Sequence, residues 1–113
     1  MKLINLAIIV FSILMVACNG EHATISVNTP TIQCGMCQKT IEMGLKKIVG
    51  INSSIVDLAT KKTKVIYDSE KTDIKSIEKA ISDLGYQANE QLADLASYEL
   101  LPACCKIGGM DHK

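Results

Sequence analysis

The chain has 113 residues, enough for one small domain, and its twelve basic residues balance its twelve acidic residues. Every basic residue is a lysine, no basic stripe is present, and aromatic residues make up only 4% of the sequence. A nucleic-acid partner is therefore not expected.

The N-terminal segment predicts export. Lys2 precedes a nearly continuous apolar run over residues 3–16, about the length of a signal-peptide core and shorter than the roughly 20 residues of a membrane span. Residues 15–18 (Met-Val-Ala-Cys) resemble the lipobox of bacterial lipoproteins, with Met in place of the commoner Leu. We expect a lipoprotein-type signal peptide over residues 1–17 and lipid attachment at Cys18. An uncleaved N-terminal anchor is the alternative.

Either reading places the domain on the outer side of a membrane, periplasmic or extracellular. Several acyl chains on Cys18 would anchor the protein stably. Without Lys2, eleven lysines remain against the same twelve acidic residues, so the exported form is nearly neutral. Residues 18–23 are expected to form a short tether, which includes His22.

The predicted elements begin with a strand over residues 24–28, where apolar and polar residues alternate. A helix is predicted over residues 37–48, followed by Gly50 as a C-terminal cap. Residues 51–58 and 63–67 are predicted to pair as an antiparallel hairpin. The first helix is predicted from apolar residues that share one face, namely Ile41, Leu45 and Ile48.

A second helix is predicted after a cap at Thr72 or Asp73, and it is expected to end at Gly85. Its apolar residues recur at helical spacing, at Ile74, Ile77, Ile81 and Leu84. Residues 86–89 are predicted as a short fourth strand. This order of elements predicts an α+β fold, a ferredoxin-like βαββαβ sandwich with two helices on one face of a four-stranded antiparallel sheet.

Two cysteines mark the junction between the first strand and the first helix, in the run Cys34-Gly35-Met36-Cys37. Cys37 is expected in or beside the first helical turn, where free N–H groups and the helix dipole favour a thiolate. A pair of thiolates on a loop suits a soft metal ion, and it suits a dithiol redox site equally well. The motif alone leaves both readings open.

The C-terminal residues 91–113 fall outside the predicted sandwich. Three leucines predict a short helix that ends before Pro102, namely Leu92, Leu95 and Leu100. Beyond it come two adjacent cysteines, Cys104 and Cys105, with Met110 and His112 close by.

Cys104 and Cys105 have two interpretations. One is a disulfide, although a bond between adjacent residues would strain the peptide that joins them, and a bond to the loop cysteines would block the loop. The other is an auxiliary soft-metal site that also uses Met110 and His112, or a segment that folds over the cysteine loop.

The cysteine loop and the element order together resemble the heavy-metal-associated domain family. That family includes copper metallochaperones, N-terminal modules of copper-transporting ATPases and the periplasmic mercury-binding protein. The resemblance covers residues 24–90. Besides the cysteine loop, it rests on four segments: Val56-Asp57-Leu58, Val65-Ile66-Tyr67-Asp68, Ile77-Glu78-Lys79-Ala80-Ile81 and Leu84-Gly85-Tyr86.

The resemblance implies a solvent-exposed site in which Cys34 and Cys37 bind Cu(I) and pass it by ligand exchange to a partner. The expected partner is a metal-transporting ATPase or another metal-binding domain. Soft thiolates select Cu(I), whereas structural zinc usually has four protein ligands. Hg(II) shares the preference for two thiolates, so Hg(II), and also Zn(II) or Cd(II), remain alternative ions.

The loop departs from the family pattern at Ile32, where the family often has a methionine. Isoleucine can fill the same apolar space, so we interpret Ile32 as support for the loop. Tyr86 matches a position often occupied by an aromatic residue or lysine near the metal, and we interpret it as loop support or core. Met36 is expected to be a loop side chain and not a ligand.

We expect no enzymatic activity, because no acid–base set with histidine and no glycine-rich phosphate loop is present. The rival reading is a thiol–disulfide oxidoreductase. A thioredoxin-like fold needs a larger sheet and an active-site cis-proline, and the chain offers only Pro30 and Pro102. The sequence therefore predicts a membrane-anchored lipoprotein that handles copper.

Overall fold

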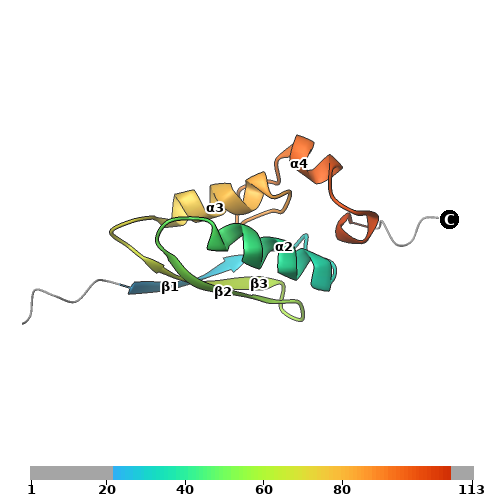
Figure 1. The fold of residues 1–113 in the computed structure, drawn as a ribbon. Coiled ribbons are helices and arrows are strands. Elements are labelled where there is room, and N and C mark those ends of the chain that lie inside the picture. The colour runs from blue at the N-terminus through green and yellow to red at the C-terminus, as the bar shows by residue number, and fades with distance from the viewer. Residues whose placement is uncertain (1–21, 108–113) are drawn as a thin grey trace, which may run out of the picture.

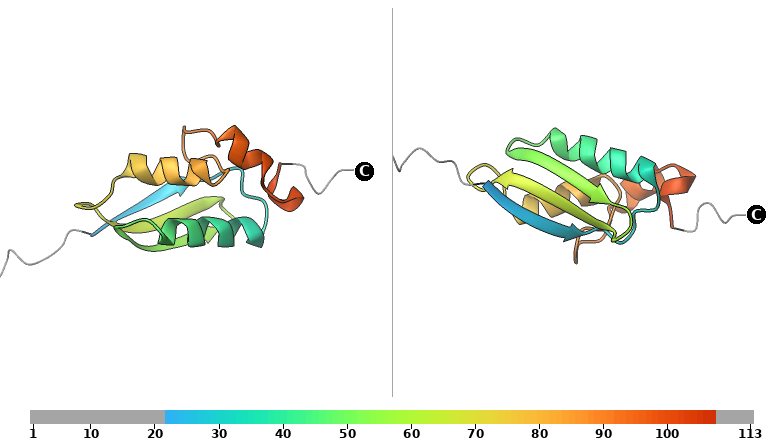
Figure 2. Two further views of the ribbon diagram at one scale, coloured as in Figure 1. Left: turned by 45° about the horizontal axis from the view of Figure 1, so that its top comes forward. Right: turned by 90° about the horizontal axis from the view of Figure 1, so that it is seen from below.

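The computed structural model describes residues 22–107. Strands β1 (His22–Asn28), β2 (Ile51–Asp57) and β3 (Lys62–Asp68) form an antiparallel sheet in the order β1-β3-β2. Two helices, α2 (Gly35–Lys46) and α3 (Ile74–Asp83), lie on one face of this sheet (Figure 1). The view from below in Figure 2 shows the three strands with no helix across them. The predicted arrangement of two helices on one face of an antiparallel sheet is confirmed.

Hydrogen bonds to the first backbone N–H groups mark where α2 and α3 begin. Helix α2 starts after Cys34, two residues earlier than predicted, because the Cys34 carbonyl already accepts the N–H groups of Cys37 and Gln38 at 3.0 and 3.3 Å. Helix α3 starts after Asp73, whose carboxylate accepts the N–H of Ser76 at 2.8 Å.

The core lies between the sheet and the two helices. The apolar spacing of α2 places Ile41 and Leu45 on its buried face, and that of α3 does the same for Ile77 and Ile81. These side chains pack on apolar residues of the strands and loops, Val27, Ile32, Val56, Val65, Tyr67, Tyr86 and Ala88. The core reaches the cysteine loop, because Cys37 belongs to it.

The predicted fourth strand over residues 86–89 does not form. The N–H of Gln87 donates to the Thr31 hydroxyl at 3.0 Å, and Ala88 forms an isolated bridge with Gln91. Asn89 has a φ of 53°, so the chain turns there and does not extend. Its N–H still donates to the Asn28 carbonyl at 2.8 Å, at the end of β1 where a fourth strand would pair.

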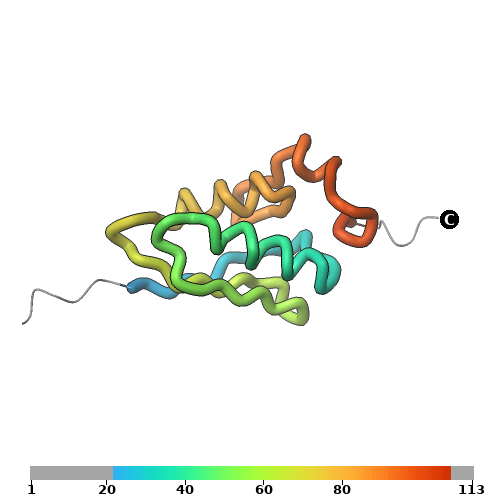
Figure 3. Tube along the Cα trace, viewed as in Figure 1, coloured from blue at the N-terminus to red at the C-terminus, as the bar shows by residue number. Residues whose placement is uncertain are grey.

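The expectation that the C-terminal segment lies outside the compact unit is wrong for its described part. This segment contains helix α4 (Leu95–Glu99) and the 3-10 turn η2 (Ala103–Cys105). It returns to the start of α2 (Figure 3), and Cys105 is 1% exposed within the core.

The short helix predicted before Pro102 forms as α4, but for a different reason. Its leucines do not drive it, because Leu95 and Leu100 are 79% and 86% exposed. Instead, the Asp94 carboxylate accepts both the N–H and the hydroxyl of Ser97 at 3.0 and 2.9 Å. Helix capping therefore positions this segment.

Several predicted features lie outside residues 22–107. These are the signal peptide over residues 1–17, the lipid attachment at Cys18, and the auxiliary ligands Met110 and His112. Within the described range, none of the helices has both the length and the apolar character required to cross a membrane. His22, expected in the tether, instead begins β1 and pairs with Asp68.

Candidate metal centre

The cysteine loop brings its two sulfurs together at the N-terminus of α2. Cys34 precedes the helix and Cys37 lies in its first turn, which places their Sγ atoms 3.9 Å apart. Metal–sulfur bonds of about 2.3 Å allow one ion to reach two sulfurs up to about 4.6 Å apart. The pair therefore lies within the span of a single ion.

The two loop cysteines differ in burial and in surroundings. Cys37 is fully buried, and its sulfur accepts the N–H of Gln33 at 3.5 Å. Cys34 is half-buried and faces the helix start. Burial acts to raise the pKa of Cys34, but the N–H of Cys37, the Cys104 thiol, the N–H of Met36 and the Cys37 thiol together lower this pKa to about 7. The Cys34 thiolate is thus more accessible near neutral pH than that of an ordinary cysteine.

Two side chains predicted to support the loop are buried beneath it. Ile32 is 1% exposed and packs within the core cluster. Tyr86 is fully buried, and its hydroxyl has no hydrogen-bond partner among the described residues. Burial raises the pKa of Tyr86, and the neighbouring Cys105 and Cys37 raise it further. A neutral phenol O–H is therefore held beside two sulfurs, and thiolates there would be able to accept it.

The C-terminal turn adds two more sulfurs. The Sγ atoms of Cys34, Cys104 and Cys105 all lie within 4.8 Å of one another, and those of Cys104 and Cys105 are 4.0 Å apart. The Cys104 thiol also donates to the thioether sulfur of Met36 at 3.5 Å, although Met36 is 54% exposed. This Met36–Cys104 contact was missed in the sequence, because it joins residues 68 positions apart.

All four described cysteines are free thiols. The neighbouring Cys34 thiol raises the pKa of Cys104, and burial raises the pKa of Cys105. Thiol groups in such a cluster can bind a soft metal ion after losing their protons.

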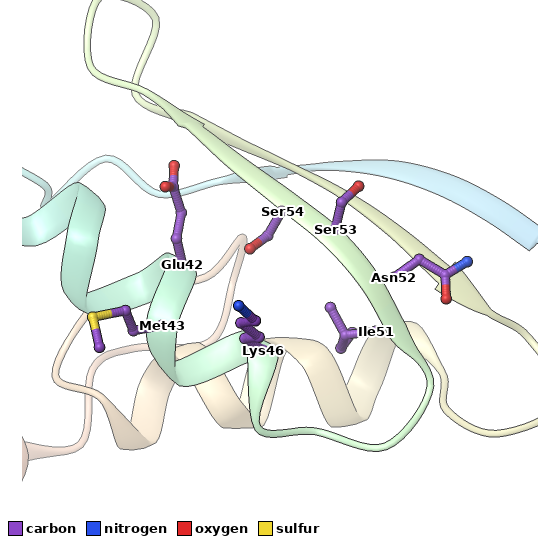
Figure 4. A pocket seen from close by; sticks show the side chains of 7 residues that line it. All are labelled: Glu42, Met43, Lys46, Ile51, Asn52, Ser53 and Ser54. Carbon is purple, nitrogen blue, oxygen red and sulfur yellow. The ribbon is translucent and has the colours of Figure 1, made fainter.

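A separate cavity of about 370 Å³ lies between α2 and β2 (Figure 4). Its lining contains no cysteine and consists of Glu42, Met43, Lys46, Ile51, Asn52, Ser53 and Ser54. Glu42 has a structural role there, because its carboxylate accepts the N–H of Val56 at 2.9 Å. The cavity offers no soft-metal ligand set, so the cysteine cluster is the candidate site.

The fold and the site define a class of protein, namely a small α+β domain that presents a cysteine pair between its first strand and first helix. The family model for the heavy-metal-associated domain matches residues 21–87. The chain therefore belongs to the heavy-metal-associated domain family.

The chain is similar to several proteins of known name. The chain is 32% identical over 86 residues to a copper-exporting P-type ATPase of Bacillus subtilis, an alignment that covers 76% of this chain and 11% of the ATPase. It is 33% identical over 63 residues to the periplasmic component of mercuric transport of Shewanella putrefaciens, covering 56% of this chain and 69% of that protein. A solved CopZ metallochaperone superposes with a TM-score of 0.57 at 30% identity, covering 58% of this chain and 98% of that one.

Proposed function

We propose that the protein binds Cu(I) through Cys34 and Cys37, for transfer or sequestration at the cell envelope, without catalysing a reaction. The observation that carries this proposal is the pair of free thiols at the start of α2, with sulfurs 3.9 Å apart. Soft thiolates favour Cu(I) over harder ions, and Cys34 reaches solvent well enough for ligand exchange.

The similar proteins support a partner that also handles metal ions. A segment of a copper-exporting ATPase matches this chain, and another match is a CopZ metallochaperone. We propose that a metal-transporting ATPase or another metal-binding domain receives the ion or supplies it. Transfer would proceed by exchange of thiolate ligands, with Cys34 as the exposed partner.

The location at the envelope is part of the proposal. It rests on the apolar run over residues 3–16 and on the lipobox-like residues before Cys18. Lipid on Cys18 would hold the domain at a membrane through the tether. Mass measurement of Cys18 in the native protein tests this point, because an unmodified cysteine would remove the lipid anchor.

Hg(II) is the second candidate ion. A relative at 33% identity is the periplasmic component of a mercuric transport system. Hg(II) also binds well to two thiolates, so the loop alone does not separate the two ions.

The test is an anaerobic metal titration of the reduced full chain, with Cys18→Ser to remove the thiol outside the domain and a mild detergent to keep the chain soluble. Cu(I) is competed against a chelator, and Hg(II) and Zn(II) are titrated in parallel. We expect tight Cu(I) binding in the parent protein and its loss in Cys34→Ser. Thr40→Ser on α2 is the control, since it keeps both sulfurs.

Two other outcomes would contradict the proposal. Binding of Hg(II) without competitive binding of Cu(I) would assign the protein to mercury. Absence of metal binding, together with rapid thiol–disulfide exchange with reduced or oxidised client proteins, would favour the oxidoreductase reading.

A further inference from the structure

The C-terminal segment is fastened to the domain next to the metal loop. The Ser82 hydroxyl at the end of α3 donates to the Leu92 carbonyl at 2.7 Å, and the Ser82 carbonyl accepts the N–H of Asp94 at 3.0 Å. Gly85 lies against the same segment, because a Cβ there would be 3.1 Å from the Leu101 side chain. The domain surface therefore accommodates this segment closely.

This attachment directs the two cysteines of η2 to different sides of the loop pair. Cys105 points inward, is 1% exposed, and neighbours Cys37 and Tyr86. Cys104 lies further out, where it contacts Met36 and neighbours Cys34. The four thiols thus form one cluster, in which the two pairs face each other.

The distances in this cluster fit a single ion bound by three sulfurs. With metal–sulfur bonds of about 2.3 Å, sulfurs in a trigonal arrangement lie about 4.0 Å apart. Cys104 and Cys105 have that separation, 4.0 Å, and Cys34 lies within 4.8 Å of both. Small side-chain adjustments would complete the arrangement.

The buried hydroxyl of Tyr86 is a second, independent indication. It has no hydrogen-bond partner among the described residues, and it lies beside the thiols of Cys105 and Cys37. A buried donor left without an acceptor is costly. Conversion of either neighbouring thiol to a metal-bound thiolate would supply an acceptor for this hydroxyl.

We propose that Cys34, Cys104 and Cys105 form a three-thiolate site for Cu(I), so that an ion bound by the loop pair is retained by the C-terminal segment. This inference rests on the proposed function of the loop pair. The ion stays bound to Cys34 while Cys104 and Cys105 replace Cys37. Each joining thiol releases one proton, Cys37 takes one up, and the ion keeps its oxidation state.

A zinc site is less well matched to this geometry. Structural zinc takes four protein ligands in a tetrahedron. The mutually close set contains three sulfurs, Cys34, Cys104 and Cys105, and Cys37 reaches it through its 3.9 Å contact with Cys34. A soft ion that accepts three thiolates therefore fits better.

The experiment uses the reduced full chain with Cys18→Ser, loaded with one equivalent of Cu(I). X-ray absorption at the copper edge counts the sulfur ligands, and chelator competition measures the affinity. We expect three sulfurs in the parent protein and two in Cys104→Ser. We also expect the affinity of Cys104→Ser to fall at least about tenfold, since even indirect ligand partners contribute that much. Ala103→Ser, in the same turn, is the matched control and should retain three sulfurs.

The two loop cysteines give the sharpest contrast. Cys37→Ser should still hold the ion with three sulfurs, whereas Cys34→Ser should lose it. Cys104 is half-buried, so its replacement tests the site without relying on the core residue Cys105.

Failure of the three-thiolate site can be distinguished from failure of the proposed function. Two sulfurs and equal affinity in the parent protein and in Cys104→Ser would overturn this inference and leave the proposed function intact. Four sulfurs, or Zn(II) that displaces Cu(I), would also overturn the three-thiolate site. No Cu(I) binding by the parent protein would remove the proposed function itself, and this inference with it.

Discussion

The cysteine loop and the C-terminal turn each bring a pair of cysteines to the same place, but the chain builds them differently. The loop pair flanks the start of a twelve-residue helix whose inner face is buried in the core, with Cys34 just before the helix and Cys37 in its first turn. The C-terminal pair lies in a three-residue turn that follows a five-residue helix with no buried residue. One pair is therefore held mainly by helix packing, whereas the other is held by a few hydrogen bonds, the burial of Cys105 and the partial burial of Leu101.

This difference implies two different energies of attachment. Disruption of the loop region requires unfolding of the core, whereas detachment of the C-terminal segment requires the loss of few contacts. We therefore expect the C-terminal half of the thiol cluster to open more readily than the loop half.

The largest expected effect is a loss of stability when a side chain is removed from the packed loop region and not from the exposed C-terminal segment. Ile41→Ala on α2 removes a fully buried side chain, so we expect the free energy of unfolding to fall by about 2–5 kcal/mol. Leu100→Ala is the matched control, because Leu100 is 86% exposed and its loss should change that energy by less than about 0.5 kcal/mol. Chemical denaturation measures both. Similar losses in the two variants would mean that the C-terminal segment is packed as firmly as the loop.

The second prediction concerns the reactivity of the two cysteine pairs in the metal-free protein. The pKa of Cys34 is lowered to about 7, whereas those of Cys104 and Cys105 are raised. Because the thiolate is the nucleophile, Cys34 should be alkylated at neutral pH more than about tenfold faster than either C-terminal cysteine.

The direction of the pH effect follows from the same shift. The folded-state pKa of Cys34 is below its unfolded value of 9.0, so the thiolate stabilises the fold above pH 9, and this contribution is lost as the pH falls through about 7. Alkylation of Cys34 should therefore decline below pH 7. Mass spectrometry of iodoacetamide-labelled peptides over a pH series measures each site. Faster labelling of Cys104 than of Cys34 would contradict the predicted order of reactivity.

The smallest effect is expected at Ser82, where the C-terminal segment bonds to the end of α3. Ser82→Ala removes the hydroxyl that donates to the Leu92 carbonyl, and we expect a loss of about 1 kcal/mol that is confined to the C-terminal segment. Hydrogen exchange should become roughly fivefold faster at the backbone amides of α4, with little change in α2. Ser76→Ala on the same helix is the control, because it keeps the backbone N–H that the Asp73 carboxylate accepts at 2.8 Å and leaves the Ser82 hydroxyl in place. Equal acceleration in α2 and α4 would show that the two regions open together.

Sequence patterns predicted the two main helices, the hairpin and the cysteine pair, because each depends on residues close together in the chain. The apolar face of α2 and the Asp73 cap of α3 are examples. They failed for the fourth strand, where the N–H of Gln87 bonds to Thr31, 56 residues away. Local alternation does not reveal a hydrogen bond of that kind.

The C-terminal segment also shows that local sequence patterns do not predict contacts between distant residues. Its leucine spacing predicted a helix, yet the leucines are exposed and Asp94 caps the helix. The burial of Cys105 depends on contacts with residues of the loop and of the chain after α3, such as Cys37 and Tyr86. The adjacent cysteines left open a disulfide, an auxiliary metal site or a segment that folds over the loop, and only the folded chain places them beside the loop pair.

The bond between Glu42 and Val56 has a consequence for self-association. Strand β2 is an edge of the described sheet, and an exposed edge can pair with the edge of another molecule. The Glu42 carboxylate occupies the Val56 N–H, a donor that such a pairing would need. It also adds a negative charge along the strand. Copies of this protein at high concentration would therefore be discouraged from joining their sheets through β2 into aggregates.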